Sequence, residues 1–458
     1  LEQYFVRLLP ISFLRGPHIA LPSAVILALG FWNSRLRPLA LLGLLIVAVM
    51  RMGIGSGGKL DRERNLVYSE KGTYGTAGFM SEEKMKELLE VVSDVRQTDG
   101  IIVGELDGKI LAIPRHKGGN SNIAVYGSSG SMKSRAFCRN AIFQSVKRGD
   151  SIICTDPKAE LYEDMSEYLR DNGYTVRVFN LVDPEHSDSW NCLQEMGGDG
   201  TMAQILTDII IKNTGSLKGD RFWDSAEANL LKAIALYVEC CYPPESRNIG
   251  EAYQLLLFKS AQELDALFDV LPLSHPARAP YQIYRQAADS VRSSILIGLG
   301  SRLQVFQSEL IRRITSYGEI DLTLPGVKRC AYFCVFSDQQ STFDFLSSLF
   351  FSFLFIKLVG FADSCTGGHL PVAVNIIGDE WPNIGTVLDY PKKISTIRSR
   401  GIHMMGLCFQ SIAQLQTRYP DTEWQILLSA CDTQLFFGAN DEATAKLVSN
   451  RTGEISVT

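Results

Sequence analysis

The feature that most constrains the fold of this chain is the segment 122–135, NIAVYGSSGSMKSR. A short apolar run breaks there into small residues and ends in a Lys-Ser pair. This layout is typical of a buried strand, a loop whose backbone amides wrap phosphate groups, and a helix whose N-terminal dipole favours negative charge. In such a loop Lys133 reaches the terminal phosphates and the Ser134 hydroxyl binds Mg²⁺. The segment therefore predicts a nucleotide site at the end of a strand.

The loop departs from the pattern GxxxxGK[ST] at one position, because Met132 stands where a glycine precedes the lysine. We expect this side chain to crowd the loop and weaken nucleotide affinity, although the backbone amides remain available. A second match, GIGSGGK at 53–59, is followed by Leu60 instead of Ser or Thr and is preceded by an apolar run, so we interpret it as a flexible juxtamembrane linker. The predicted nucleotide-binding residues are Gly127, Ser128, Ser129, Gly130, Ser131, Met132, Lys133, Ser134 and Arg135.

Bulk composition sets wider limits. A chain of 458 residues with 46% apolar residues is long enough for two or three domains. Its net charge of −5 means that a polyanionic partner must be met by a local basic surface. The ten cysteines lack paired metal-ligand spacing and are predicted to be reduced core thiols, and the six dispersed histidines indicate no zinc or nucleophile-base site. Because the chain begins without Met and stops directly after a strand-like pattern, we expect a fragment.

Two apolar runs, 19–32 and 36–54, distinguish the first 55 residues from the rest. A bilayer core of ~30 Å needs ~20 helical residues, so the runs predict a hairpin of two transmembrane helices. A cleaved signal peptide is the alternative, which the second run and the lack of an A-x-A-like site disfavour. Basic residues follow the second run and place the remainder on the cytoplasmic side; they are Lys59, Arg62, Arg64 and Lys71.

From about residue 75 the pattern alternates between strands and helices, which predicts an α/β fold with a parallel sheet covered by helices. The segment 195–315 loses strand character and has helical spacing, which predicts an inserted all-α domain. The expected domains are therefore 1–55, 56–194, 195–315 and 316–458. The expected helices are 81–95, 133–148 and 160–172, the expected hairpin is 101–113, and the expected strands are 123–126, 151–155, 175–180, 329–336, 372–377, 402–409 and 433–437.

A second chemical motif is PVAVNIIGDEW at 371–381, a buried strand that ends in two adjacent acids. In a P-loop ATPase the first acid, here Asp379, orders the Mg²⁺ shell, and the second, here Glu380, polarises the attacking water. An acid pair that caps the next helix is the alternative interpretation. The upstream phosphate loop favours the catalytic one, and an inserted domain explains the long separation between the two motifs.

Six motifs then follow one another along the chain: GSSGSMKSR, TDPKAELYEDMSEYLRDNGYTVRVFNLVDPEHSDSWN, DRFWDSAEANLLKAI, IGDEWPNIG, SRGIHMMGLCFQSIAQL and FFGANDEATAKLVS. With them the chain, from about residue 118 to its end, resembles the type IV secretion coupling proteins. These are the TraG/TraD-like ATPases of bacterial conjugation, and the resemblance is to their Gram-positive mobile-element branch. The order and spacing of the motifs are far more specific than a lone phosphate loop.

The resemblance implies a RecA-like P-loop ATPase that uses ATP and Mg²⁺, forms a homo-hexamer, and is anchored as a multi-pass protein in the bacterial plasma membrane. Its implied partners are single-stranded DNA with its relaxase, and the type IV secretion channel subunits. The implied metal ligands are Ser134 and Asp379, and the implied catalytic residues are Lys133, Glu380, Gln410 as a phosphate sensor and Arg400 as a finger to the neighbouring subunit. Arg398 is an equal candidate for the finger. Strand-end hydrogen bonding for Gln410 and surface solvation for the arginines are the alternatives.

Nucleic-acid contacts are less well defined. Basic residues gather at 392–400, 312–313 and 328–329, and each group is also typical of a solvated surface. Phe222 and Trp223 could stack on bases, but a core or subunit contact is the stronger expectation. Two other functions stay open: a membrane docking receptor that binds nucleotide without substantial turnover, which Met132 motivates, and an FtsK-like translocase on double-stranded DNA.

Overall fold

The computed structural model describes Pro38, Leu42 and residues 59–62, 66–68, 75–114, 120–215 and 221–455. Apart from Pro38 and Leu42, the predicted membrane hairpin lies outside this part of the chain. The chain divides into two units, one formed by 1–80 with 448–458 and the other by 81–447. In the first unit, β1 (Lys59–Asp61) pairs antiparallel with β2 (Leu66–Tyr68), so the predicted linker 53–59 ends at a strand. A bridge between Thr76 and Ile455 joins its two segments.

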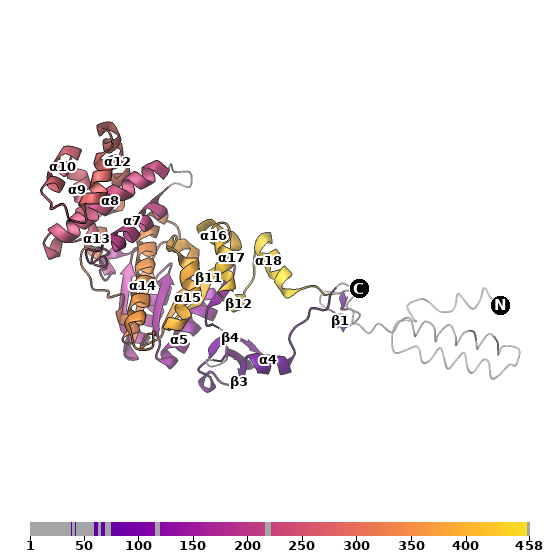
Figure 1. Ribbon diagram of the computed structural model, residues 1–458. Helices are drawn as coiled ribbons and strands as arrows, with labels where there is room; N and C mark the ends of the chain where they lie inside the picture. The colour runs from indigo at the N-terminus through magenta and orange to yellow at the C-terminus, as the bar shows by residue number, and fades with distance from the viewer. Residues whose placement is uncertain are drawn as a thin grey trace. The chain divides into compact units, whose positions relative to one another are not determined.

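A seven-stranded sheet organises the second unit (Figure 1). Every neighbouring pair in it is parallel, and the strand order is β12-β6-β11-β10-β7-β9-β8. The strands are β6 (Ile123–Tyr126), β7 (Ser151–Asp156), β8 (Thr175–Asn180), β9 (Cys330–Val335), β10 (Val374–Gly378), β11 (Ile402–Phe409) and β12 (Thr433–Phe436). All seven predicted strands of this sheet are confirmed, as is the α/β fold class.

The central strands are apolar throughout because helices bury both faces of the sheet. Alternate residues of β7 enter two separate cores: Ile152 and Cys154 join the core that contains α5 (Arg139–Arg148) and α6 (Glu160–Asp171), whereas Ile153 joins the larger one. The larger core contains α14 (Asp344–Ser364). Further helices after β10 and β11 are α15 (Tyr390–Thr396), α16 (Ile412–Arg418), α17 (Glu423–Ser429) and α18 (Glu442–Thr452).

Helix α14 is the principal element that the sequence interpretation missed. Within the described residues it lies in the one helix, Ser341–Ser364, that is long and apolar enough to cross a membrane, but 72% of its most apolar window is buried inside the protein. Its phenylalanines pack on the sheet, as in the stacked pair Phe179–Phe350. They also pack on the helices of the segment 200–314, which we call the helical region. A helix buried on nearly all sides lacks the amphipathic period on which sequence-based assignment depends.

Helices alone fill the described part of the segment 200–314, which forms one end of the unit (Figure 1). This agrees with the helical spacing of the sequence, while the domain boundaries stay a prediction. The helices are α7 (Gly200–Thr214), α8 (Arg221–Cys241), α9 (Ile249–Phe258), α10 (Ala261–Asp269), α11 (Arg278–Arg285), α12 (Asp289–Arg302) and α13 (Glu309–Ile314).

A small antiparallel sheet precedes the main one, with strand order β3-β5-β4. It confirms the predicted hairpin, since β4 (Ile101–Leu106) and β5 (Lys109–Ile113) turn at Asp107 and Gly108. The single helix predicted over 81–95 is wrong beyond its first half: α4 (Glu82–Leu88) gives way to β3 (Glu90–Val92). Pairing of Val91 with Leu111 outweighs the helical spacing of this segment.

Candidate functional site

The carboxyl ends of the parallel strands meet at one edge of the sheet, which is where α/β proteins place their ligands. A cavity of about 540 Å³ lies at that edge, and we call it the strand-end cavity. It brings together the phosphate loop after β6, the acid pair after β10 and the residue after β11. The cavity is lined by Ser129, Gly130, Ser131, Met132, Lys133, Ser134, Arg135, Asp156, Pro157, Lys158, Glu160, Leu161, Asp338, Asp379, Glu380, Asn383, Gln410 and Gln414.

The loop at the start of the cavity requires its first glycine. A Cβ atom on Gly127 would lie 2.3 Å from Ser131 Oγ and 2.9 Å from the Lys133 side chain, so a larger residue would displace the side chains of the phosphate loop. The Gly127 amide donates to Phe409 O at 3.1 Å, which fixes the loop to the neighbouring strand. Gly127 and Ser128 thus lie behind the cavity wall, and the remaining predicted loop residues line it.

Met132 adopts a left-handed backbone conformation, with φ of 64°. That conformation costs a non-glycine residue about 1–2 kcal/mol, which explains why the phosphate-loop pattern has glycine at this position. The side chain is 61% exposed. The departure from the pattern therefore strains the backbone, whereas the expected crowding by the side chain is not seen.

Lys133 lies at the start of the first helical turn, η5 (Ser134–Cys138), which precedes α5. Its side chain is 5% exposed, and its Nζ donates to Gly127 O at 2.6 Å and to Ser128 O at 3.4 Å. The same ammonium group lies 3.2 Å from Glu380 Oε1. The loop lysine and the second strand-end acid therefore form a largely buried ion pair.

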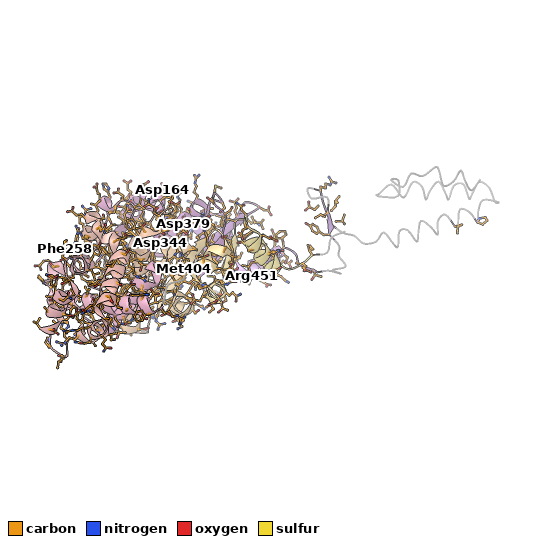
Figure 2. All side chains as sticks on the ribbon, turned by 90° about the horizontal axis from the view of Figure 1, so that it is seen from above. Asp164, Phe258, Asp344, Asp379, Met404 and Arg451 are labelled. Carbon is orange, nitrogen blue, oxygen red and sulfur yellow. The ribbon has the colours of Figure 1, made fainter. Side chains whose placement is uncertain are left out.

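Ser134 and Asp379 form the second contact between the loop and the acid pair. Ser134 Oγ donates to Asp379 Oδ2 at 2.5 Å, and Thr155 Oγ1 holds the Asp379 backbone by donating to its carbonyl at 2.7 Å. Burial raises the pKa of Asp379 above its ordinary value, while the bond from Ser134 opposes that rise. Asp379 is labelled within the folded unit in Figure 2.

Buried oxygens with unused bonding capacity surround these two contacts. Asp379 Oδ1, Glu380 Oε2 and Ser131 Oγ are buried, and none of them has a hydrogen-bond partner in the part of the chain that the structure describes. Hydroxyl and carboxylate oxygens are the ligands that Mg²⁺ prefers, usually together with substrate phosphates. The residues of the cavity therefore fit a magnesium ion at Ser134 and Asp379.

Two thiols lie behind Asp379 in the second core. The sulfurs of Cys138 and Cys408 are 3.9 Å apart, and with the Asp379 carboxylate their ligand atoms lie within 4.8 Å of one another. The hydrogen bond with Cys408 and burial raise the pKa of Cys138 well above its ordinary value. Protonated thiols bind metal poorly. A metal ion near Asp379 would therefore be bound on the side of the cavity oxygens and not between the two sulfurs. Core burial is not general among the cysteines, because Cys240 and Cys241 are exposed.

Sequence interpretation missed part of the cavity wall. Asp156 lines it from the end of β7, Lys158 from the turn that follows β7, and Asp338 from the connection after β9. Burial raises the pKa of Asp156 to about 6, and the nearby charge of Asp379 contributes in the same direction. The available signal was the DPK triplet directly after a predicted buried strand, since neighbouring parallel strands end at the same edge.

The family described as "Type IV secretory system Conjugative DNA transfer" matches residues 72–458 of the chain. The chain belongs to this conjugative DNA transfer family. Protein VirD4 of Rhizobium rhizogenes is 24% identical over 315 residues, which are 66% of this chain and 45% of that protein. Protein VirD4 of Rhizobium radiobacter is 26% identical over the same length and is covered to 44%. The chain thus spans about half the length of the curated relatives that it matches.

Solved structures agree with the fold. The plasmid coupling protein TrwB in complex with ADP and Mg²⁺ is similar with a TM-score of 0.62 at 17% identity, and the match covers 83% of this chain and 83% of that one. The conjugative DNA transfer family and these neighbours together support a type IV coupling protein with an α/β NTPase fold.

The remaining predicted site residues of this family member differ in position. Gln410 lines the strand-end cavity, and its backbone N–H donates to Gln414 Oε1 at 3.1 Å. Arg400 instead pairs with Asp363, with Nε 2.7 Å from Oδ1, and does not line the cavity of its own subunit. Arg398 is exposed. A role of either arginine toward a neighbouring subunit stays a prediction.

The predicted basic stretch at 392–400 is only partly available as a surface. Burial lowers the pKa of Lys393 to about 8, and its ammonium donates to the Leu388 carbonyl. Together with the Arg400–Asp363 pair, this leaves Lys392 and Arg398 as the exposed cations of the stretch. A role of these two cations in binding a nucleic acid stays a prediction.

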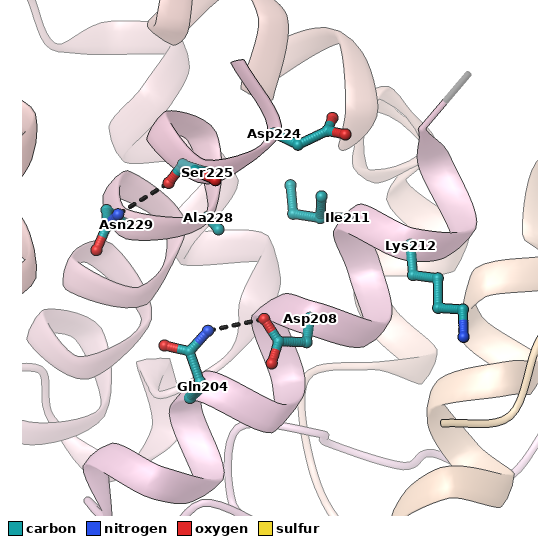
Figure 3. A pocket seen from close by; sticks show the side chains of 8 residues that line it. All are labelled: Gln204, Asp208, Ile211, Lys212, Asp224, Ser225, Ala228 and Asn229. Carbon is teal, nitrogen blue, oxygen red and sulfur yellow. Dashed lines mark hydrogen bonds between the residues drawn. The ribbon is translucent and has the colours of Figure 1, made fainter. Parts of the chain in front are cut away.

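A second cavity, of about 340 Å³, lies between α7 and α8 in the DRFWDSAEANLL segment (Figure 3). Asp208, Asp224 and Lys212 line it, and Asp224 also pairs with Arg302. At the start of α8, Phe222 and Trp223 are 57% and 37% exposed and meet edge to face at 5.4 Å. The expectation was a core or subunit contact: these two rings are not part of the core, and a subunit contact stays a prediction.

Proposed function

We propose that this chain is the membrane-anchored ATPase coupling protein of a conjugative transfer system, which recruits relaxase-bound single-stranded DNA to a type IV secretion channel. One observation carries the proposal: the Lys133–Glu380 and Ser134–Asp379 contacts join two distant segments at a single cavity. The TrwB complex with ADP and Mg²⁺, and a second TrwB complex with the non-hydrolysable ATP analogue ADPNP (TM-score 0.60, 17% identity), support ATP and Mg²⁺ as its ligands.

In the proposed reaction, the phosphate-loop amides and Lys133 hold the β- and γ-phosphates. Lys133 must then exchange its ion pair with Glu380 for the phosphates. Because a carboxylate that loses its cation becomes a stronger base, the exchange prepares Glu380 to orient and deprotonate water. Glu380 thus becomes an effective base only when the γ-phosphate is in place.

Ser134 and Asp379 would hold Mg²⁺, which neutralises charge that develops on the phosphate oxygens when it is bound. Thr155 supports this arrangement by fixing the Asp379 backbone. Gln410, at the end of β11, is proposed to detect the terminal phosphate. Arg398 or Arg400 is proposed to reach the nucleotide of a neighbouring subunit, because a planar guanidinium spreads charge over phosphate oxygens.

The wider organisation is part of the same proposal. Residues 1–55 form the membrane anchor, 56–194 and 316–458 form the nucleotide-binding domain, and 195–315 form the all-α insert that faces the cytoplasm. The working assembly is a homo-hexamer in the bacterial plasma membrane, with single-stranded DNA in its channel. The channel subunits of the secretion system and the relaxase are its protein partners.

The decisive experiment measures ATP hydrolysis by the full chain in detergent, alone, with single-stranded DNA and with double-stranded DNA. We expect multiple turnovers that single-stranded DNA accelerates and that Lys133→Ala abolishes. Preferential acceleration by double-stranded DNA would instead support an FtsK-like translocase. Equal activity of the wild type, Lys133→Ala and Glu380→Gln would refute the assignment of the site.

A docking receptor that binds nucleotide without substantial turnover is the second candidate, and the strained Met132 favours it. Nucleotide-dependent assembly without measurable hydrolysis would support the receptor, whereas robust turnover would exclude it.

A further inference from the structure

Two of the cavity's lysines have different surroundings. Lys133 is buried and held by two carbonyls, whereas Lys158, in the turn after β7, is 63% exposed. Lys158 Nζ lies 3.9 Å from Oδ2 of Asp338, which is 35% exposed. Because exposed pairs at this distance contribute little free energy, Lys158 can leave Asp338 at small cost.

The backbone that carries Lys158 is nevertheless well fixed. Asp156 is buried and accepts the Tyr162 backbone N–H at 2.9 Å, and the ring of Pro157 fixes the φ of that residue itself. Ala159 completes the turn in a left-handed conformation, with φ of 62°. A fixed turn with an exposed side chain is suited to present a cation to one region of the strand-end cavity.

Sheet register places that turn beside the acid pair. Thr155 of β7 pairs with Gly378 of β10 on one side, and Asp156 pairs with Val335 of β9 on the other. Lys158 therefore follows a strand end that lies directly between the strand ends leading to Asp379 and to Asp338. All three side chains line the same cavity.

Charge balance gives this cation a task. Five carboxylates line the cavity against three cations. Lys133 is already paired with Glu380, and Lys158 with Asp338. ATP brings one more phosphoryl group, and hence more negative charge, than ADP, so an additional cation at the γ-phosphate favours ATP over ADP. The cations are Lys133, Arg135 and Lys158, and the carboxylates are Asp156, Glu160, Asp338, Asp379 and Glu380.

We infer that Lys158 binds the γ-phosphate of ATP in exchange for Asp338 and thereby distinguishes ATP from ADP. This inference rests on the proposed function. The released Asp338 belongs to the short connection 336–343 between β9 and α14. From α14, Ser348 accepts a hydrogen bond from Asn213 of α7 at 3.0 Å. The exchange thus connects the γ-phosphate to the helical region through a single helix.

The test compares equilibrium binding of ADP and of a non-hydrolysable ATP analogue to the full chain, with Mg²⁺. Lys158→Met should weaken the ATP analogue about tenfold and leave ADP within about twofold, because a charge-assisted contact to one phosphate is lost. Asp338→Asn should strengthen the ATP analogue about threefold, because the competing carboxylate is removed. Lys446→Met, which removes an exposed lysine paired with Glu442, is the matched control and should change neither.

Hydrogen exchange over residues 336–343 provides a second readout. The ATP analogue, but not ADP, should alter exchange there in the wild type, and Lys158→Met should remove that difference. An unchanged ATP-to-ADP affinity ratio in Lys158→Met, or a weaker ATP analogue in Asp338→Asn, would overturn the inference. If the wild type binds neither nucleotide, the proposed function fails; if it binds both and only the Lys158 result is negative, this inference alone fails.

Discussion

The strand-end cavity and the helical region differ in backbone conformation. Met132 and Glu380, which line the cavity, and Ala159, next to the lining residue Lys158, have φ values of 64°, 51° and 62°. Among the described residues of 200–314, none has a positive φ. The helical region instead holds buried charges in paired networks, such as Arg302 with Asp224 and Glu227. Strain of this kind persists only where the surrounding structure enforces it. Asp107, Asp389 and Asp421 share this conformation outside the cavity, whereas Met132 and Glu380 belong to the proposed site.

The largest expected effect is on nucleotide binding at the strand-end cavity. Lys133→Ala should abolish detectable ATP binding, because the loop loses its phosphate cation and Glu380 is left as a largely buried, unpaired charge. Isothermal titration with ATP and Mg²⁺ measures the loss. Lys446→Ala serves as the control for removal of an exposed lysine, and wild-type affinity in Lys133→Ala would contradict the proposed site.

Glu380→Gln separates chemistry from binding. It should lower the hydrolysis rate by ~10²–10⁴ while nucleotide affinity is kept, because the amide still accepts from Lys133 but cannot take a proton. Steady-state hydrolysis and titration on the same preparation check both parts. A similar loss of affinity would place Glu380 in binding rather than in catalysis.

Arg302→Met tests the helical region. Glu227 is buried, and Arg302 supports both it and Asp224, so removal of the cation should cost about 3 kcal/mol of the free energy of unfolding. Urea unfolding followed by circular dichroism measures this cost, and nucleotide affinity should stay unchanged. Arg96→Met, which breaks an exposed Arg–Asp pair, should have no measurable effect. A loss of nucleotide affinity in Arg302→Met would contradict the separation of stability in the helical region from binding at the strand-end cavity.

Met132→Gly should have the smallest effect. Relief of the left-handed backbone should raise the free energy of unfolding by about 0.5–1 kcal/mol, since the exposed side chain gives up little packing and glycine entropy offsets part of the gain. Met132→Ala retains the strain and should show no gain. Equal stability of the two variants would indicate that the loop carries no strain at this position.

Much of the fold could be predicted from local pattern. Seven short apolar runs with turn residues between them gave the strands, because a parallel sheet buries both faces of each strand. The helical spacing of 200–314 likewise predicted that this segment consists of helices. Helix α14 was not predicted because its apolar residues lie on all sides of the helix. The helix over 81–95 was predicted too long because pairing of Val91 with Leu111 overrides the local helical preference.

Prediction of the site was uneven for a related reason. The loop residues and the acid pair follow strands directly, so their type and position in sequence indicate their chemistry. Lys158 and Asp338 follow strands too, but their proximity depends on β7 lying between β9 and β10. Arg400 looked available as a finger, yet the chain folds it onto Asp363.

What the sequence determined by itself is the local chemistry: a strand, a phosphate loop and a helix in immediate succession, and a second strand that ends in Asp379 and Glu380. Neighbours along the chain dictate these features through backbone sterics and apolar burial. The tertiary structure alone decided that Lys133 meets Glu380, that Ser134 meets Asp379 and that Lys158 faces Asp338. Such contacts depend on which strands pair, and strand order is settled by the packing of the whole sheet rather than by any local period.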